Sequence, residues 1–280
     1  MQQLNDRFGI SWRPDLAAGI LAHLDHIDAV EVIADDYFDA PRGRIEPLLT
    51  LGACAPILLH GVTQGLASTV GADTRRLTKM ARLFEATRAE SWSEHLAFVR
   101  GGGIEIGHLA APPRNAATVD GTLQNLEAAA RVVGVAPMME NIATLIEPPA
   151  SSMGEAAWIG KVVAGTEGGL LLDLHNLHVN STNFGYDPIS FLDQIPCERV
   201  HGVHLAGGRL LGQTGRVLDD HLHDVPDPVY ALLAELAARV PHPLTVILER
   251  DGNYPRIESL LAQLDLAREA VALGRRKRAA

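Results

Sequence analysis

Histidine and acidic residues stand directly after several short apolar runs in this sequence. His60 follows residues 57–59, and Asp173 follows residues 170–172. A single residue of this kind is more often a hydrogen-bonded structural group than a ligand. The pattern recurs, however, and imidazole nitrogens and carboxylate oxygens are ligands that iron, zinc and manganese accept. The candidates for one metal site are His60, His95, Glu140, Asp173, Asn176, His204, Asp219, His221 and Glu249.

The number of candidates indicates how many ions such a site would hold. Gathering these groups at one place would cost on the order of several kcal/mol in desolvation unless cations compensate. One transition ion rarely takes more than about six ligands, so the set predicts two or three ions and leaves the element open. Asp219 and His221 are two residues apart, and an extended segment would point both to the same side. A solvated acidic loop is the alternative for that segment.

The elements that must position these residues follow from hydrophobic periodicity. Short apolar or β-branched runs alternate with amphipathic stretches, as in βαβ units. Eight such strand and helix pairs predict an α/β fold, a single (β/α)8 barrel of the TIM type. We expect one domain over residues 1–274 and a basic disordered tail at 275–280. Between the sixth and seventh strands we expect a single helix, residues 188–194. The predicted strands are residues 8–11, 29–33, 56–60, 91–96, 137–140, 169–173, 199–205 and 244–249.

A barrel of this type carries its active site at the carboxyl ends of the strands. The candidate ligands fall at these ends or in the segment after the seventh strand, so we expect them at one rim. The expected catalytic centre comes from adjacent or near-adjacent strands and consists of Glu140, Asp173, His204 and Glu249.

Other histidines are expected to lie outside the ligand set. His201 is three residues before His204 on one strand, so the two side chains face opposite sides of the sheet. His242 lies between prolines before the eighth strand, and His108 lies in a glycine-flanked loop. His175 and His178 stay candidates for a supporting role because their neighbours are predicted ligands.

Composition excludes several classes of protein. The 280 residues are 47% hydrophobic and 21% charged, which excludes disordered and fibrous classes. No apolar run approaches the roughly 18 residues that span a bilayer, and the opening residues lack a signal-peptide pattern, so we expect a cytoplasmic protein without membrane contact. Cys54 and Cys197 offer neither a disulfide framework nor a thiolate cluster. A net charge of −10 disfavours nucleic acid as a partner.

Taken together, the motifs resemble a known family, the multinuclear non-haem iron-dependent oxidases related to the methanobactin biosynthesis oxidase. The resemblance covers nearly the whole chain. It rests on His60-Gly61-Val62, Ser93-Glu94-His95-Leu96, Glu140-Asn141, Leu172-Asp173-Leu174-His175-Asn176, His204-Leu205-Ala206-Gly207, Asp219-Asp220-His221 and Glu249-Arg250-Asp251-Gly252.

The resemblance implies both an activity and a cofactor. It implies a TIM-like barrel with two or three irons, Fe(II) or Fe(III), at the nine candidate positions, and O2 as co-substrate. The substrate would be a ribosomally synthesised precursor peptide, with cysteine as the favoured target residue. Three segments depart from the family pattern, and they bear on the substrate pocket more than on the metals: Ser11-Trp12-Arg13-Pro14, Asp35-Asp36-Tyr37-Phe38 and Gly208.

Two other functions fit parts of the pattern. One is a metal-dependent barrel hydrolase or isomerase of the endonuclease-IV or xylose-isomerase type. It is disfavoured because none of Lys79, Lys161 and Lys277 lies at a predicted strand end, and because the net charge is negative. The other is a catalytically silent metal-binding or peptide-binding scaffold, which would not need nine candidate ligands.

Recognition of the peptide is expected to involve two arginines and a second protein. Arg13 follows the first predicted strand and Arg250 the eighth, and these strands are neighbours in a closed barrel. Guanidinium groups bind carboxylates through two hydrogen bonds, so both residues are predicted to bind substrate. Local ion pairs, for example with Asp251, are the alternative. The barrel uses nearly all of the chain, so we expect a small leader-peptide-recognition partner protein.

Overall fold

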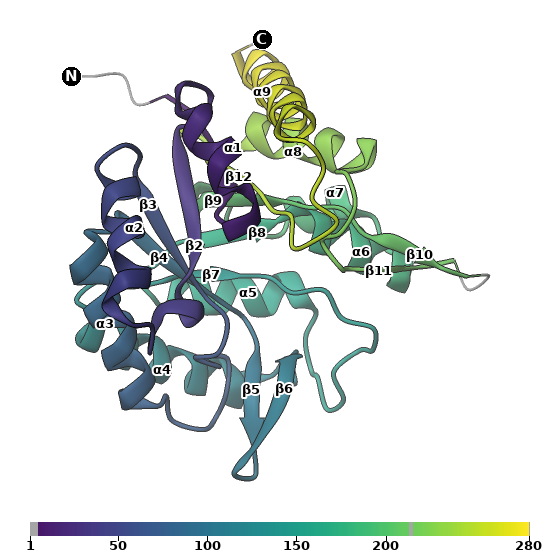
Figure 1. Cartoon of the computed structure of the whole chain (residues 1–280). Coiled ribbons are helices and arrows are strands. Elements are labelled where there is room, and N and C mark those ends of the chain that lie inside the picture. Colours follow the sequence, from purple (N-terminus) through teal and green to yellow (C-terminus); the bar gives the residue numbers. More distant parts are fainter. Residues whose placement is uncertain (1–4, 213–214, 280) are drawn as a thin grey trace. The chain divides into compact units, whose positions relative to one another are not determined.

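Eight parallel strands form a closed barrel in the computed structural model, which describes residues 5–212 and 215–279 (Figure 1). The strand order is β1-β12-β9-β8-β7-β4-β3-β2, so the predicted single TIM-type barrel is confirmed. The barrel strands are β1 (Arg7–Ser11), β2 (Ala29–Ile33), β3 (Ile57–Gly61), β4 (Ser91–His95), β7 (Met138–Glu140), β8 (Leu170–Asp173), β9 (Val200–Leu205) and β12 (Thr245–Leu248).

Helices and two short hairpins connect these strands. The hairpins pair β5 (Phe98–Gly101) with β6 (Ile104–Ala110), and β10 (Arg209–Leu211) with β11 (Arg216–Leu218). None of the described helices is long and apolar enough to cross a membrane. The helices are η1 (Pro14–Leu16), α1 (Ala17–Ala22), η2 (Leu24–His26), η3 (Ala34–Tyr37), α2 (Arg42–Gly52), α3 (Thr74–Thr87), α4 (Ala116–Val133), α5 (Glu155–Ala164), α6 (Leu174–Phe184), α7 (Pro188–Leu192), η4 (Cys197–Arg199), α8 (Asp227–Arg239) and α9 (Ile257–Ala279).

The chain forms two compact units. The central unit runs from Glu31 to Leu170, and the terminal unit combines Met1–Val30 with Leu171–Ala280. In the central unit, β4 pairs with β3 on one side and with β7 on the other. The registers place Gly61 opposite Glu94 and His95 opposite Glu140, so the carboxyl ends of the three strands are level. Buried Trp92 fixes the start of β4 by donating its indole N–H to the Val135 carbonyl at 2.8 Å.

In the terminal unit, β12 pairs with β1 and β9, and helices α8 and α9 lie against each other (Figure 1). Gly274 makes this close approach possible, because a Cβ atom there would lie 2.2 Å from the Ala234 carbonyl oxygen of α8. The register of β9 and β12 places His204 opposite Ile247, and the Glu249 amide donates to the Leu205 carbonyl at 2.9 Å. His204 and Glu249 therefore come from neighbouring strand ends.

The predicted disordered tail differs from the structure, in which α9 continues to Ala279. Arg275 explains the difference. Its guanidinium donates to the carbonyls of Ala237 and His242 and forms an ion pair with Asp6 at 2.6 Å. By donating to a carbonyl at the end of α8, Arg275 stabilises the last turns of α9. Its positive charge also interacts favourably with the negative end of the α9 dipole. Residue 280 lies outside the described residues.

Helix α6 and both hairpins were not predicted. The expected helix at residues 188–194 is present as α7, but α6 precedes it directly after β8. Helix α6 buries His175, Asn176 and Asn180 as well as its apolar residues. Buried polar residues on the inner face remove the apolar periodicity by which an amphipathic helix is recognised.

Candidate metal-binding site

The central cluster consists of His60 at the end of β3, His95 at the end of β4 and Glu140 at the end of β7. The Nε2 atoms of the two imidazoles are 3.4 Å apart, and each lies 3.3 Å from Oε2 of Glu140. His60 and Glu140 are fully buried, whereas the His95 side chain is 13% exposed. Three predicted ligands from three strands thus come together as the sequence predicted.

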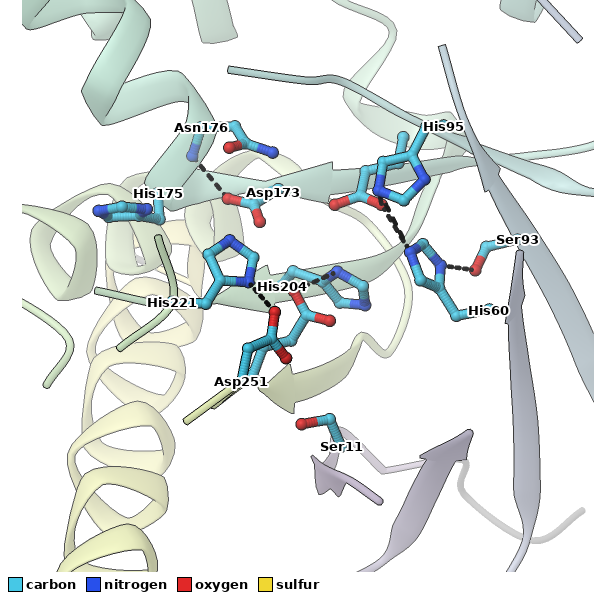
Figure 2. A network of polar contacts seen from close by, with 12 residues as sticks. Ser11, His60, Ser93, His95, Asp173, His175, Asn176, His204, His221 and Asp251 are labelled. Atoms are coloured by element: carbon cyan, nitrogen blue, oxygen red, sulfur yellow. Dashed lines mark hydrogen bonds and ion pairs between the residues drawn. The ribbon is translucent and has the colours of Figure 1, made fainter. Parts of the chain in front are cut away.

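Hydrogen bonds at the opposite ring nitrogens orient both imidazoles of the central cluster. His60 Nδ1 lies 2.8 Å from the Ser93 hydroxyl (Figure 2). His95 Nδ1 lies 3.1 Å from the Gly61 carbonyl oxygen. A carbonyl oxygen only accepts, so His95 carries its proton on Nδ1. Ser93 also reaches the Leu59 carbonyl at 3.5 Å, which leaves its oxygen to accept from His60. Both Nε2 lone pairs then face Glu140, an arrangement that suits a cation.

Glu31 is a further acidic residue of the central unit that sequence reasoning did not select. It lies in the middle of β2, is 3% exposed, and offers a carboxylate oxygen within 4.8 Å of a ligand atom of His60. The available signal was a carboxylate inside the apolar run Ala29-Val30-Glu31-Val32-Ile33. Such a buried carboxylate requires a partner of opposite charge or hydrogen-bond donors.

Two other acidic residues of the central unit support the loop after β3. Glu94 accepts hydrogen bonds from the backbone amides of His95 at 2.9 Å and Gln64 at 3.2 Å. Asp35 accepts from the amides of Val62 at 2.8 Å and Thr63 at 3.2 Å. Both carboxylates therefore hold the backbone next to His60 and His95 in place. Asp35 belongs to a segment that departs from the family pattern, and these hydrogen bonds give it a structural role.

The terminal cluster consists of Asp173, His175, His204, Asp219, His221 and Glu249. One ligand atom each of Asp173, His204 and Glu249 lies within 4.8 Å of the other two, and the same holds for His175, Asp219 and His221. His221 joins the two groups, because its Nδ1 is 3.3 Å from Oε2 of Glu249 and its Nε2 is 3.0 Å from Oδ1 of Asp219.

Carboxylates lie between the imidazoles of the terminal cluster. His204 Nδ1 is 3.2 Å from Glu249 Oε2, and His175 Nδ1 is 2.7 Å from Asp219 Oδ1. Beside His221, Asp251 adds a carboxylate oxygen at 3.4 Å (Figure 2). His175 was expected only in a supporting role. In the sequence, its membership of the cluster was indicated by its position between the predicted ligands Asp173 and Asn176.

The charges of this cluster shift the ionisation of its members. Burial disfavours the charged form of His221, but the carboxylates of Asp219, Asp251 and Glu249 outweigh it and raise the pKa of His221 well above its ordinary value. Burial likewise opposes ionisation of Asp219, yet His221 and His175 lower the pKa of Asp219 well below its ordinary value. His221 also has a φ of 54°, a left-handed conformation that costs a non-glycine residue on the order of 1 to 3 kcal/mol.

The remaining predicted ligand, Asn176, occupies the first turn of α6. Asp173 caps that helix by accepting from the Asn176 amide at 2.6 Å, so one of its oxygens serves the fold (Figure 2). Asn176 is buried, and in the sequence it directly follows the cluster residue His175. Its role as a ligand stays a prediction.

The two arginines predicted to bind substrate form ion pairs within the terminal unit. Arg13 contacts Asp251 at 2.5 Å, and Arg250 contacts Asp224 at 2.6 Å. Arg250 is 5% exposed, and its buried Nη1 has no hydrogen-bond acceptor among the described residues. Local pairing thus accounts for Arg13 and for one half of the Arg250 guanidinium.

The histidines excluded on sequence grounds lie outside both clusters. His201 is exposed at the start of β9 and stacks on His242 with ring centroids 4.5 Å apart, whereas His204 is fully buried. His242 faces the carbonyls of Pro243 and Glu198. His108 is exposed on β6 rather than in a loop, and its ring faces the Leu109 carbonyl. His178 lies one turn after His175, with ring centroids 6.4 Å apart.

The donor sets of both clusters fit divalent transition ions. They contain only imidazole nitrogens and carboxylate oxygens, the ligands that suit iron, zinc and manganese. Neither cysteine takes part, because Cys54 is exposed and Cys197 donates its thiol to the Leu192 carbonyl. The convergence of two Nε2 lone pairs on one carboxylate oxygen in the central cluster is the clearest sign of fit.

Comparison with known sequences identifies a family. The sequence profile described as "RiPP precursor modification enzyme MbnB/TglH/ChrH" matches residues 7–272; RiPPs are ribosomally synthesised and post-translationally modified peptides. A "UPF0276 protein" of Streptomyces avermitilis is 37% identical over 271 residues, covering 94% of this chain and 54% of the relative, so the chain spans about half of that protein. A "UPF0276 protein" of Caulobacter vibrioides is 31% identical, covering 97% of this chain and 96% of the relative.

Comparison with solved structures shows the fold. D-psicose 3-epimerase from Clostridium cellulolyticum has a TM-score of 0.60 at 12% identity, covering 97% of this chain and 99% of that chain. Endonuclease IV from Thermus thermophilus has a TM-score of 0.59 at 16% identity, covering 94% of this chain and 99% of that chain. At such identities the likeness concerns the barrel and not the activity.

Proposed function

The chain belongs to the MbnB/TglH/ChrH family of RiPP precursor modification enzymes, and on this premise we propose that it is a multinuclear non-haem iron oxidase. It would use O2 to modify a residue of a ribosomally synthesised precursor peptide, with cysteine as the favoured target. The observation that carries the proposal is the central cluster, in which His60 and His95 direct Nε2 lone pairs at Glu140. Buried imidazole and carboxylate groups of this kind suit iron.

The proposed irons, two or three per chain, would be held by the nine residues that the sequence singles out. His60, His95 and Glu140 would serve in the central unit, and the terminal unit would contribute Asp173, Asn176, His204, Asp219, His221 and Glu249. Bound iron supplies the one-electron and O2 chemistry that amino-acid side chains lack. Of these residues, Glu140, Asp173, His204 and Glu249 are proposed as the catalytic set.

The protein itself would orient the ligands and exclude water. Ser93 and the Gly61 carbonyl hold the imidazoles of His60 and His95 through their Nδ1 atoms. His204 is fully buried and Glu249 is 5% exposed, so solvent does not compete for their ligand atoms. Hydrogen bonds to the second ring nitrogen fix the tautomer and the ring plane of a ligating histidine.

Peptide binding is proposed to involve Arg13, Arg250 and a small leader-recognition protein. The structure supports peptide binding better for Arg250 than for Arg13. The Nη1 atom of Arg250 is buried without an acceptor among the described residues, while its Nη2 donates to Asp224 at 2.6 Å. A carboxylate or carbonyl oxygen of the peptide would satisfy Nη1. Arg13 would have to exchange its ion pair with Asp251 for the peptide. Unchanged Michaelis constants in both Arg13→Ala and Arg250→Ala would remove the arginines from the proposal.

The test combines oxygen uptake with the mass of the peptide. The full chain is loaded with ferrous iron without oxygen and mixed with any cysteine-containing precursor peptide that a neighbouring gene encodes, with and without a small protein encoded there. We expect O2 consumption and a change in peptide mass that both depend on iron and are lost in Glu140→Gln. Full turnover without the small protein would eliminate the partner from the proposal.

The alternative is a metal-dependent hydrolase or isomerase. Solved barrels of this fold include epimerases and endonuclease IV, but the likeness extends only to the fold. Lys79 pairs with Asp39 and Lys277 with Glu235, and no lysine joins either cluster in the described part of the chain. A metal-dependent change in a sugar or nucleic acid without O2 uptake would favour this alternative over the oxidase.

A further inference from the structure

Asp219 of the terminal cluster is held by a histidine that lies outside the predicted ligand set. His175 occupies the first turn of α6 and is 1% exposed. Its Nδ1 lies 2.7 Å from Oδ1 of Asp219, and the same oxygen lies 3.0 Å from Nε2 of His221. A hydrogen bond of this length between an imidazole and a carboxylate is charge-assisted and strong.

Helix α6 also holds the strand that leads to Asp219. The side chain of Asn183 donates to the Val217 carbonyl at 3.0 Å and accepts from the Val217 amide at 2.8 Å, as a neighbouring strand would. His175 and Asn183 are eight residues apart, so they share one face of the helix. The same face of α6 therefore forms hydrogen bonds with Val217 of β11 and with Asp219, two residues later.

The ring of His175 fits only because residue 208 is a glycine. A Cβ atom on Gly208 would lie 2.8 Å from Cε1 and 3.1 Å from Nε2 of His175, and 2.2 Å from the Leu218 carbonyl oxygen. The Nε2 side of the ring is thus packed against the backbone of the β10–β11 hairpin. Nδ1 is the ring nitrogen that faces the cluster.

We propose that His175 is a positioning residue, which donates its Nδ1–H to Asp219 and so keeps that carboxylate directed at His221. The inference rests on the metal-binding role of the terminal cluster and adds a residue that acts through one of its ligands. Groups that orient a metal-binding side chain are typically worth about 10- to 100-fold in metal affinity.

The test compares three variants of the full chain by anaerobic titration with Co2+ and with Fe2+. His175→Phe keeps the volume but removes the donor, whereas His175→Asn carries an amide N–H donor on Cγ, at the position of Nδ1. His178→Phe changes the half-buried histidine one turn later and is the matched control. We expect His175→Phe to weaken binding of the terminal-cluster ion about 10- to 100-fold, His175→Asn to recover most of it, and His178→Phe to match the wild type.

Further readouts separate positioning from folding. In the metal-free variants the unfolding temperature should change little, whereas the metal affinity of His175→Phe should fall. Where His175→Phe does not fold, His175→Leu replaces it, because it has no N–H donor in its side chain and should bind metal more weakly than His175→Asn. Wild-type affinity in His175→Phe, or equal losses in His175→Phe and His178→Phe, would overturn the inference.

The outcome is distinguishable from failure of the proposed function. A wild type that binds Co2+ but shows no iron-dependent O2 uptake contradicts the oxidase, while the affinity ratio between the variants still decides the role of His175. A wild type that turns over peptide while His175→Phe retains every ion contradicts only the positioning role. A wild type that binds neither ion contradicts both.

Discussion

The central and terminal clusters use the same ligand types but hold them with different neighbours. In the central cluster, the Nδ1 atoms of His60 and His95 face a hydroxyl and a backbone carbonyl, which carry no charge. In the terminal cluster, the imidazoles of His175 and His221 face the Asp219 carboxylate. Neutral anchors leave Nε2 lone pairs for a cation, whereas the carboxylates around His221 favour its protonated form when no metal is bound.

This difference indicates how each cluster would take up an ion. A histidine must lose its proton before its lone pair can bind metal. Because its carboxylate neighbours raise the pKa of His221 well above the ordinary value, metal uptake in the terminal cluster must release a proton. In the central cluster, the contacts at Nδ1 of His60 and His95 already leave both Nε2 atoms facing Glu140. We therefore expect metal affinity of the terminal cluster to fall more steeply as the pH is lowered.

The largest expected effect comes from removing a ligand of the terminal cluster. Glu249→Ala deletes the carboxylate that faces both His204 and His221, at 3.2 and 3.3 Å. We expect metal affinity and activity to drop together by at least about 100-fold, and Asp173→Ala to behave alike. Elemental analysis after gel filtration measures the retained metal. Exposed Glu269→Ala on α9 is the control, and full metal content in both ligand variants would refute the assignment.

A smaller effect is expected from loosening the central cluster. Ser93→Ala removes the hydroxyl that accepts from His60 Nδ1 and leaves the other ligands in place. We expect about 10-fold weaker binding of one ion, because the imidazole can then rotate or change tautomer. A Co2+ titration monitored by visible absorption measures it. Ser91→Ala, two residues earlier on β4, is the matched control, and equal affinities of the two variants would contradict the role of Ser93.

The residues of the central cluster could be predicted from the sequence because apolar strand runs end in them. The parallel barrel makes the ends of β3, β4 and β7 level, so strand order alone brought His60, His95 and Glu140 together. Glu31 could not be predicted in the same way, because it lies inside an apolar strand, where a core position is the ordinary expectation. Helix α6 could not be predicted either, because its polar residues are buried, and the position of His175 therefore had no predicted element to support it.

The pH dependence of stability tests the charged pair of the terminal cluster in the metal-free protein. The raised pKa of His221 means that its stabilising effect is complete below 6.5 and is lost as the pH rises through its folded pKa. The lowered pKa of Asp219 means that its effect is present above 3.8 and is lost as the pH falls towards its folded pKa. The pair therefore stabilises most between these two values.

We accordingly expect Asp219→Asn to lower the free energy of unfolding by about 2 kcal/mol near pH 5.5 and by less at pH 9. Urea unfolding in the presence of a chelator measures both values. Asp265→Asn, which removes an exposed carboxylate of α9, should show no such pH dependence. A loss that is the same at both pH values would argue against a protonated His221 in the metal-free state.

The smallest effect concerns one thiol in each unit. Burial raises the pKa of Cys197 to about 11, and its thiol donates to the Leu192 carbonyl at 3.3 Å. Cys54 in the central unit is exposed. A thiol reagent at pH 8 should label Cys54 within minutes and Cys197 only on unfolding, because the thiolate is the reactive form. Rapid labelling of both in the native protein would show that the terminal unit opens locally.

Counting the irons in each chain tests the central claim most directly. The wild type, His95→Ala and Asp219→Ala are loaded with ferrous iron without oxygen, freed of excess metal, and measured by elemental analysis and Mössbauer spectroscopy. We predict two or three irons per wild-type chain, and fewer in each variant because each has lost a ligand of a different cluster. A single zinc ion with no iron uptake under any loading condition would contradict the account.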